Sequence, residues 1–240
     1  RGGSDLSAIA VAASLDADVC QILTDVDGVY TCDPRIVLNA RKLPEISYDE
    51  MLEMASSGTK VMQSRSVEFA KKYGVVFEVC SSLNDNPGTL VTEEHPAMEA
   101  VVIRGVSIER SQARVTITDI PDTPGQSGKI LGCLADAEIN VDMIVSNISS
   151  DGMARHSFTM HTNDLGRAQA ALKPVLSELS SDANIESEAA LAKLSTVGIG
   201  MRSHAGVAAK MFQALGKAGI NIGMITTSEI KISVTVSESQ

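Results

Sequence analysis

The chain has 240 residues, of which 44% are hydrophobic, and a formal net charge of −10. This length and composition are enough for two or three domains with cores of their own. The negative charge argues against binding to nucleic acid or to an anionic membrane surface, and the lack of an apolar run of about 18 residues predicts a soluble, cytoplasmic protein.

The four cysteines form no Cys-x-x-Cys pair, and the four histidines lack metal-ligand spacing. Three of the cysteines, Cys20, Cys80 and Cys133, lie in apolar strand or helix patterns. The sequence therefore predicts buried, reduced thiols and no protein metal site.

The chain opens with Arg-Gly-Gly-Ser-Asp, followed by an alanine-rich helix pattern over residues 6–15. Ser4 or Asp5 is available as the helix N-cap, and the glycines let the backbone approach a ligand. Free N–H groups at such a helix start attract anions, which predicts a phosphate or carboxylate site. The same element is also a common turn and cap.

Residues 19–23 are a short apolar run, which is typical of a strand buried in a parallel sheet. The segment Thr24–Arg35, TDVDGVYTCDPR, follows at its carboxyl end, where open α/β sheets bind their ligands. These residue types can line a nucleotide site. The alternative is a solvated connection with Gly28 in a turn and Pro34 as a stop.

Further along, the pattern predicts one α/β layer structure with a mostly parallel sheet. Ser47 and Glu50 form a capping box that opens a helix to about residue 56, and residues 64–73 form a second helix closed by Gly74. Strands are expected at 75–80 and 89–91. The polar, proline-containing residues 92–98 are typical of a linker.

An internal repeat fills the remainder of the chain. Seven residues recur at one offset, since 206 − 125 and 225 − 144 both equal 81. This period is too long for a solenoid unit of roughly 20–50 residues, so it indicates two related small domains. The members of the first copy are Gly125, Leu134, Ala137, Ile139, Asn140, Met143 and Ile144, and those of the second are Gly206, Leu215, Ala218, Ile220, Asn221, Met224 and Ile225.

Each copy is expected to run strand, glycine turn, helix, strand. The expected elements of the first copy are 114–119, 124–137, 140–147, 153–161, 165–179 and 184–187, in the ferredoxin-like order βαββαβ. Those of the second copy are 194–200, 206–218, 221–227 and 230–236. The second copy lacks a final helix and strand, so either residues 101–109 complete it or it is cut short.

In order along the chain, RGGSD, TDVDGVYTCDPR and the segment EISYDEMLEMASSGTKV (residues 45–61) resemble the second half of the kinase domain of aspartate kinases, in the amino acid kinase family. The repeat resembles the tandem ACT domains that follow it. The resemblance implies a C-terminal kinase part of α/β fold over residues 1–92, a linker over 93–100, a first ACT domain over 101–190 and an incomplete second one over 191–240.

The resemblance also implies the function: phosphorylation of the L-aspartate side-chain carboxylate by ATP with Mg²⁺, inhibited by lysine, threonine or both. Phosphoryl transfer needs positioning and charge neutralisation, which suits the residue types. The implied aspartate residues are Arg1, Ser4 and Asp5. The implied ATP residues are Thr24, Asp25, Tyr30, Arg35 and Lys60. Without the resemblance, Lys60 reads as a surface residue past a helix C-cap at Gly58.

The implied effector residues lie at the glycine turns and at the following strands of both ACT copies. Backbone amides there would take a carboxylate, and acidic and amide side chains an amine. The alternative is that the glycines only make turns and the asparagines only begin strands. The implied residues are Asp122, Thr123, Pro124, Gly125, Ser127, Asn140, Val141, Asp142 and Ser146 in the first copy, and Val207, Ala208, Asn221, Ile222, Ser228 and Glu229 in the second.

Three departures from the family pattern stand out. Gln63-Ser64 replaces a more usual His-Pro, and Ala205 replaces a proline before Gly206. The glycine-rich segment with a principal catalytic lysine has no counterpart, so the chain is expected to be a fragment that is inactive by itself.

Alternatives stay open. Some relatives make a regulatory subunit from an internal start, and Met98 lies at that point, so the chain could serve as a binding module. A third hypothesis is a kinase for glutamate or a nucleoside monophosphate. The expected assembly is a homodimer, or a heterotetramer with a shorter ACT-containing subunit.

Overall fold

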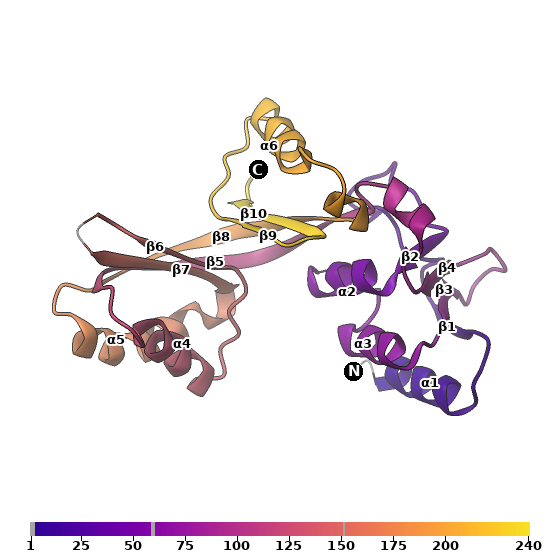
Figure 1. The fold of residues 1–240 in the computed structure, drawn as a ribbon, viewed down its shortest axis with the longest axis horizontal. Helices are drawn as coiled ribbons and strands as arrows, with labels where there is room; N and C mark the ends of the chain where they lie inside the picture. Colours follow the sequence, from indigo (N-terminus) through magenta and orange to yellow (C-terminus); the bar gives the residue numbers. More distant parts are fainter. Residues whose placement is uncertain (1–2, 59–60, 151) are drawn as a thin grey trace. The chain divides into compact units, whose positions relative to one another are not determined.

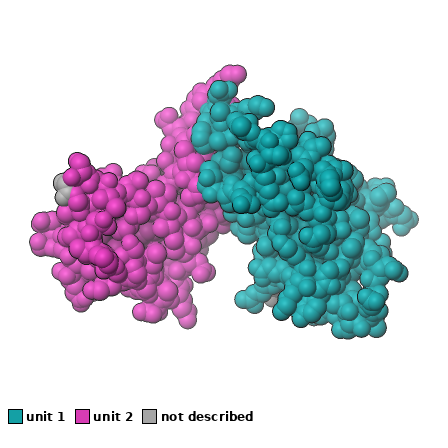
Figure 2. All heavy atoms as spheres, in the orientation of Figure 1, with its two compact units in different colours: residues 1–108, 194–213, 227–233 teal, residues 109–193, 214–226, 234–240 magenta. Residues whose placement is uncertain are grey.

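The computed structural model describes residues 3–58, 61–150 and 152–240 (Figure 1). The chain forms two compact units, coloured separately in Figure 2. Unit 1 comprises residues 1–108, 194–213 and 227–233, and unit 2 comprises residues 109–193, 214–226 and 234–240. Each unit is thus built from three separate stretches of sequence. Across the described ranges, no helix is long and apolar enough to cross a membrane.

Unit 1 contains a four-stranded sheet with the order β1-β3-β4-β2. The β1–β3 and β2–β4 pairs are parallel, and β3–β4 is antiparallel. The expected α/β fold with a mostly parallel sheet is confirmed, and the β3–β4 pair is antiparallel. The strands are β1 (Cys20–Thr24), β2 (Glu45–Ser47), β3 (Phe77–Ser81) and β4 (Thr89–Thr92).

Three helices stack beside this sheet in the order α2, α3, α1 (Figure 1). The predicted capping box is present, because the Ser47 hydroxyl accepts from the Glu50 N–H while the Glu50 carboxylate accepts from the Ser47 N–H. Gly74 closes α3 in the left-handed conformation, with φ of 65°. The helices are α1 (Gly3–Ser14), α2 (Tyr48–Ser56) and α3 (Ser64–Tyr73).

Apolar side chains from these helices and strands form the core of unit 1. Ile9 of α1, Met51 of α2, Val67 of α3 and Phe77 of β3 are all fully buried in it. Val197, from far along the chain, belongs to the same core and is also fully buried. Residues of the second repeat copy are therefore part of the folding unit that contains the kinase-like segment.

The expected linker contains a short 3-10 helix, η1 (Pro96–Ala100). Met98, on this helix, is 1% exposed and packs with Ile199 and Ile230. The segment is polar in sequence, but one apolar side chain anchors it in unit 1.

The second sheet has six strands in the order β6-β7-β5-β8-β10-β9. In unit 2, β7 pairs antiparallel with both β5 and β6, and helices α4 and α5 cover one face (Figure 1). Ile117, Leu134, Phe158 and Leu172 meet in the core between them. The elements are β5 (Gly105–Pro121), α4 (Gln126–Asp136), β6 (Ile144–Ile148), β7 (Met153–His161), η2 (Thr162–Asp164), α5 (Leu165–Leu179), β8 (Asn184–Val197), η3 (Ile199–Arg202), α6 (Val207–Lys217), β9 (Ile225–Thr227) and β10 (Lys231–Ser237).

The ferredoxin-like order predicted for the first copy is confirmed, but two strands are longer than expected. β5 begins at Gly105, and β8 joins two segments that were predicted as separate strands. Ser111 and Ala190 have φ of 59° and 58° in the interiors of these strands. A left-handed residue shifts the alternation of side chains, so a period-2 pattern breaks there although the strand continues.

The start of β5 helps to complete the second copy. In unit 1, the Arg104 N–H donates to the Val197 carbonyl over 2.8 Å, just before β5 begins. Of the two alternatives for residues 101–109, the structure therefore supports their pairing with the second copy. The strands after each repeat helix begin at Ile144 and Ile225, four residues later than the predicted asparagines.

Candidate functional site

The carboxyl ends of β1 and β3 meet, as the parallel arrangement requires. The N–H and the hydroxyl of Ser82 donate to the Thr24 carbonyl over 2.8 and 3.1 Å. The Thr24 hydroxyl donates to the Asp25 carboxylate over 3.0 Å. Thr24 and Asp25 therefore lie together at the sheet edge where ligands of α/β folds bind.

A polar cluster follows in the loop after β1. The Tyr30 hydroxyl donates to Asp27 over 2.7 Å, and the Lys42 ammonium lies 3.5 Å from the other Asp27 oxygen. The hydrogen bond from Tyr30, with the nearby Lys42 charge, lowers the pKa of Asp27 despite partial burial, and the same bond raises the pKa of Tyr30. The cluster thus combines a stable carboxylate, a phenol and an ammonium, a set that suits a polar, charged ligand.

Asp27 and Lys42 were missed in the sequence. Lys42 is 12 residues beyond Tyr30 and comes beside it through an isolated antiparallel bridge, for which no periodic pattern exists. The Lys42 ammonium also donates to the Pro87 carbonyl over 2.6 Å.

Gly28 fixes the start of this loop against β4. Its φ is 146°, and a Cβ there would lie 2.6 Å from the Thr89 hydroxyl oxygen. That hydroxyl accepts from the Val29 N–H over 2.8 Å and donates to the Leu43 carbonyl over 2.6 Å. Gly28 thus lies at a bend, and the Thr89 hydroxyl bonds to both sides of the loop.

Arg35 is exposed to solvent and pairs with a neighbouring carboxylate. Its guanidinium forms a two-bond pair with Asp33, at 3.0 and 2.8 Å, and its side chain is 82% exposed. This pairing lowers the pKa of Asp33. An exposed arginine of this kind is available to a ligand at the rim of the loop.

At the start of the chain, helix α1 already includes Ser4 and Asp5 in its first turn. The expectation that one of them is the N-cap is therefore wrong, because the helix begins earlier, at Gly3. The Ser4 hydroxyl donates to Asp5 over 3.2 Å, and an acidic side chain in a first turn is favoured by the helix dipole. The predicted ligands Arg1 and Lys60 lie outside the described residues.

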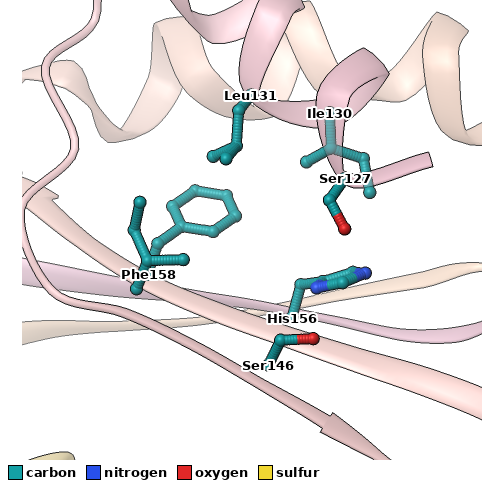
Figure 3. A pocket seen from close by; sticks show the side chains of 7 residues that line it. Ser127, Ile130, Leu131, Ser146, His156 and Phe158 are labelled. Carbon is teal, nitrogen blue, oxygen red and sulfur yellow. The ribbon is translucent and has the colours of Figure 1, made fainter. Parts of the chain in front are cut away.

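In the first repeat copy, a cavity of about 70 Å³ lies between α4 and strands β6 and β7 (Figure 3). Ser127 and Ser146, both predicted effector residues, line it together with His156 and with apolar side chains. His156 was missed, because a lone histidine in a strand carries no distinctive spacing. Burial lowers the pKa of His156, although the charge of Asp122 opposes this. The lining is Ser127, Ile130, Leu131, Ile144, Ser146, His156 and Phe158.

The turn before α4 is built as predicted. Gly125 is the N-cap of α4 in the left-handed conformation, with φ of 92°. The Gln126 side-chain amide donates to the Thr123 hydroxyl, and the Asp122 N–H donates to the Gly152 carbonyl over 2.9 Å. Pro124 and the other residues of the turn from 122 to 125 are exposed; beyond α4, Asn140 is exposed and Val141 is half-buried.

Asp142 has an intramolecular partner that the sequence did not reveal. The buried Lys193 ammonium contacts the carboxylates of Asp142 and Glu109, the latter at 2.7 Å. Burial lowers the pKa of Lys193, but the hydrogen bonds that its ammonium donates to Asp142 and Glu109 more than offset this, so the pKa is raised. An effector amine at Asp142 would have to compete with Lys193.

The predicted residues of the second copy fall in both units. Val207, Ala208, Ser228 and Glu229 belong to unit 1, whereas Asn221 and Ile222 belong to unit 2. Within unit 1, the Ser228 N–H donates to the Lys231 carbonyl over 2.8 Å, and Glu229 lies 3.5 Å from Arg202.

Among the described residues, no group of three or more His, Cys, Asp or Glu side chains is arranged to hold a metal ion. The four cysteines are free thiols, two of them buried.

Comparison with known proteins identifies three segments of the chain. The amino acid kinase family profile matches residues 1–81, and ACT domain profiles match residues 113–178 and 194–240. An aspartate kinase from Stutzerimonas stutzeri is 51% identical over 239 residues, which cover 99% of this chain and 58% of the relative. The chain thus spans about three-fifths of the length of the curated relatives that it matches.

Two solved structures are similar over different spans. The structure of E. coli aspartokinase III in complex with aspartate and ADP is 30% identical, with a TM-score of 0.78, and the match covers 100% of this chain and 53% of that one. A chain from the structure of aspartokinase alpha and beta subunits is 42% identical, with a TM-score of 0.53, and the match covers 57% of this chain and 89% of that one.

Proposed function

Because this chain belongs to the aspartate kinase family, we propose that it is part of an enzyme that transfers the γ-phosphoryl group of ATP to the side-chain carboxylate of L-aspartate. A carboxylate oxygen of aspartate attacks the γ-phosphorus and forms the new P–O bond. The bond from that phosphorus to the oxygen bridging to the β-phosphate breaks, and its electron pair leaves with ADP. The products are 4-phospho-L-aspartate and ADP.

The observation that carries the proposal is the arrangement after β1. Thr24 and Asp25 lie at the carboxyl end of a strand paired in parallel, and the Asp27–Tyr30–Lys42 cluster follows directly. We assign Thr24, Asp25, Tyr30 and Lys60 to the nucleotide and the exposed Arg35 to the rim of its site. Lys42 is a further cation on this side, and its charge favours phosphate.

We assign the aspartate substrate to the start of α1, to Arg1, Ser4 and Asp5. The N–H groups of the first turn attract a carboxylate, and an arginine can bind one through two bonds. The related E. coli enzyme whose structure contains aspartate and ADP supports this pair of ligands.

Mg²⁺ would accompany the nucleotide and neutralise charge on its phosphates. The described residues provide no site of three acidic, histidine or cysteine ligands. Mg²⁺ that is bound with a nucleotide is held chiefly by phosphate oxygens and by one or two protein carboxylates. Asp25, at the end of β1, is the carboxylate that would serve here.

We further propose that the ACT copies bind an amino acid effector, lysine or threonine. In the first copy, the N-cap turn at Gly125 offers N–H groups for a carboxylate, and the cavity lined by Ser127, Ser146 and His156 offers room for part of a side chain. The enzyme would assemble as a homodimer, or with a shorter ACT-containing subunit.

A regulatory module that begins near Met98 is the second candidate function. The similarity to a chain from aspartokinase alpha and beta subunits, which covers 57% of this chain, favours it. Detection of a natural product that starts at Met98 would support this candidate, and a single full-length product would exclude it.

Calorimetric titration tests both parts. The chain is titrated with lysine and threonine, separately and together, and then with ATP and Mg²⁺, while the full-length protein is assayed for aspartate-dependent ADP formation. Effector binding supports the ACT assignment, and the absence of binding by either amino acid overturns it. Activity with glutamate and not aspartate would overturn the substrate assignment.

A further inference from the structure

Glu50 has more bonds than its role as a helix cap requires. It lies in the first turn of α2 and is 0% exposed. One carboxylate oxygen, Oε2, accepts from the Ser47 N–H and hydroxyl, each at 3.2 Å. A glutamine or an exposed glutamate satisfies a capping box equally well, so the cap does not explain the burial of a charge.

The other bonds of Glu50 reach distant parts of unit 1. Its Oε1 accepts from the Ile199 N–H over 3.0 Å, across 149 positions of sequence. The Arg104 Nε lies 3.3 Å from Oε2, and the Arg104 side chain is only 6% exposed. The Arg104 guanidinium also donates to the Met98 carbonyl over 3.2 Å. A buried carboxylate thus joins the kinase-like helix α2 to η3 of the second ACT copy.

The Ile199 N–H is held in place by close packing of backbone on backbone. A Cβ on Gly198 would lie 2.4 Å from the Val102 carbonyl oxygen, and one on Gly200 would lie 2.6 Å from the Glu99 carbonyl oxygen. Only glycine permits this approach on either side of Ile199. The bond to Glu50 therefore has a rigid donor.

A second tie lies one turn further along α2. The Lys231 ammonium at the start of β10 pairs with Glu53 at 2.7 Å, and both side chains are about one-quarter exposed. Glu50 and Glu53 lie three residues apart and therefore on the same side of the helix. Two segments of the second ACT copy, η3 through Ile199 and β10 through Lys231, contact that side of α2.

We propose that Glu50 is a positioning residue that makes the placement of helix α2 depend on the second ACT copy. A displacement of η3 alters the Ile199–Glu50 bond and exposes a buried charge unless α2 moves with it. Separating the partners of a buried ion pair is strongly unfavourable, because it leaves an uncompensated buried charge. The bonds of Glu50 to Arg104 and Ile199 have one favourable arrangement, so a change on the ACT side alters the energy on the α2 side. Such a connection can couple the kinase-like part to the second ACT copy.

The functional consequence rests on the proposed function. Helix α2 ends at Ser56, four residues before Lys60, which we assign to the ATP phosphates. A change in the conformation of the second ACT copy that moves α2 would therefore affect the placement of Lys60 relative to the ATP phosphates. Effector binding would reach the kinase site by this route.

The test is a double-mutant cycle read by hydrogen–deuterium exchange at the α2 amides in the whole chain. The perturbation is Ser195→Ala, which removes a buried hydrogen bond of 2.8 Å to the Ser233 hydroxyl within the second ACT copy. In the wild-type background it should accelerate α2 exchange on the order of tenfold. In the Glu50→Gln background, which removes the charge that faces Arg104 and replaces one of the two accepting oxygens by a nitrogen that cannot accept, it should change α2 exchange by less than about twofold.

Asp49→Asn is the matched control, because it removes the same charge from the neighbouring residue of the same helix. Asp49 pairs with Lys71 of α3 at 2.6 Å, away from the ACT copy. In this background Ser195→Ala should keep its full effect on α2. Equal effects in the Glu50→Gln and Asp49→Asn backgrounds would overturn the proposal, as would an unchanged α2 in the wild-type background.

If Glu50→Gln does not fold, Lys231→Met takes its place in the cycle and should reduce the effect of Ser195→Ala on α2 exchange at least twofold; an undiminished effect counts against the proposal. The cycle needs no effector, so failure of lysine and threonine to bind would remove the proposed regulation and leave the Glu50 result standing. Where they bind, they should change α2 exchange in the wild type and not in Glu50→Gln.

Discussion

The Lys193 ammonium lies 2.7 Å from a carboxylate oxygen of Glu109 and also contacts Asp142, although the Lys193 side chain is only 6% exposed. The two carboxylates are 33% and 45% exposed. A cation buried in this way is stabilised mainly by its partners, while the partners retain access to water. The contribution of the cluster to the free energy of unfolding can therefore be measured by replacing Lys193.

Lys193→Met should lower the free energy of unfolding by about 1–2 kcal/mol, less than for a fully buried pair because both carboxylates remain partly hydrated. Urea unfolding followed by circular dichroism measures the change. Lys173→Met, at an exposed position of α5, is the control and should stay within about 0.5 kcal/mol of wild type. Equal losses in both variants would show that the ion pairs stabilise nothing.

The same cluster predicts a dependence on high pH. The folded pKa of Lys193 is raised above its ordinary value of 10.5, because the bonds to Asp142 and Glu109 outweigh burial. The contribution is therefore complete below the unfolded pKa and is lost as pH rises through the folded pKa. As the pH rises above 10.5, wild type should lose more stability than Lys193→Met. Parallel curves for the two proteins would contradict the pairing.

Ala190→Gly should stabilise the protein by about 1 kcal/mol, because Ala190 adopts φ of 58° within β8 and glycine has no Cβ clash there. Thermal unfolding should show a higher Tm. Ala189→Gly is the control: its backbone is not in the left-handed region, so the same change should lower the Tm. A lower Tm in both variants would rule out strain at Ala190.

Tyr30→Phe should raise the pKa of Asp27 toward its ordinary value, since the Tyr30 hydroxyl is the largest cause of the lowered pKa. NMR titration of the Asp27 carboxyl carbon measures the shift. Tyr73→Phe, at an exposed tyrosine of α3, should leave Asp27 unchanged. If Tyr30 lines the nucleotide site as proposed, its variant should also bind ATP more weakly, and unchanged ATP affinity would remove Tyr30 from that site.

His156→Leu addresses the cavity of the first ACT copy. Burial lowers the pKa of His156, so its neutral form is favoured in the fold and stability should fall as pH drops through the unfolded value near 6.5. The leucine variant should lose this pH dependence between pH 7 and 5. The variant should also bind a hydroxyl-bearing effector more weakly if the cavity receives its side chain. A pH dependence identical to wild type would show that His156 is not buried in solution.

Much of the fold followed from patterns of nearby residues. The capping box at Ser47 and Glu50 and the left-handed end of α3 at Gly74 are present as predicted, because each depends on residues within one helical turn. The two related copies were predicted in a different way, from seven residues that recur at one offset of 81 positions. The long strand β5 was predicted only from residue 114 onward and β8 was predicted as two strands, since left-handed residues inside them interrupt the side-chain alternation.

The candidate site was predictable only in part. Thr24 and Asp25 follow an apolar run and were recognised from that position, whereas Lys42 and His156 come into their sites through strand pairings that leave no local signal. Asp142 was predicted as an effector residue, but its partner Lys193 is 51 positions away.

The amino-acid sequence by itself determined the local elements, their order and the family, because helix caps, turns and strand patterns depend on neighbours along the chain. Only the tertiary structure decided that Glu50 bonds to Arg104 and Ile199, and that part of the second ACT copy, residues 194–213 and 227–233, shares a folding unit with the kinase-like segment. Those contacts join residues 54 and 149 positions apart. They form because a buried carboxylate is stable only with hydrogen-bond donors around it, and these donors come from whichever segments the fold places nearby. The spacing of residues in the sequence does not show which segments those are.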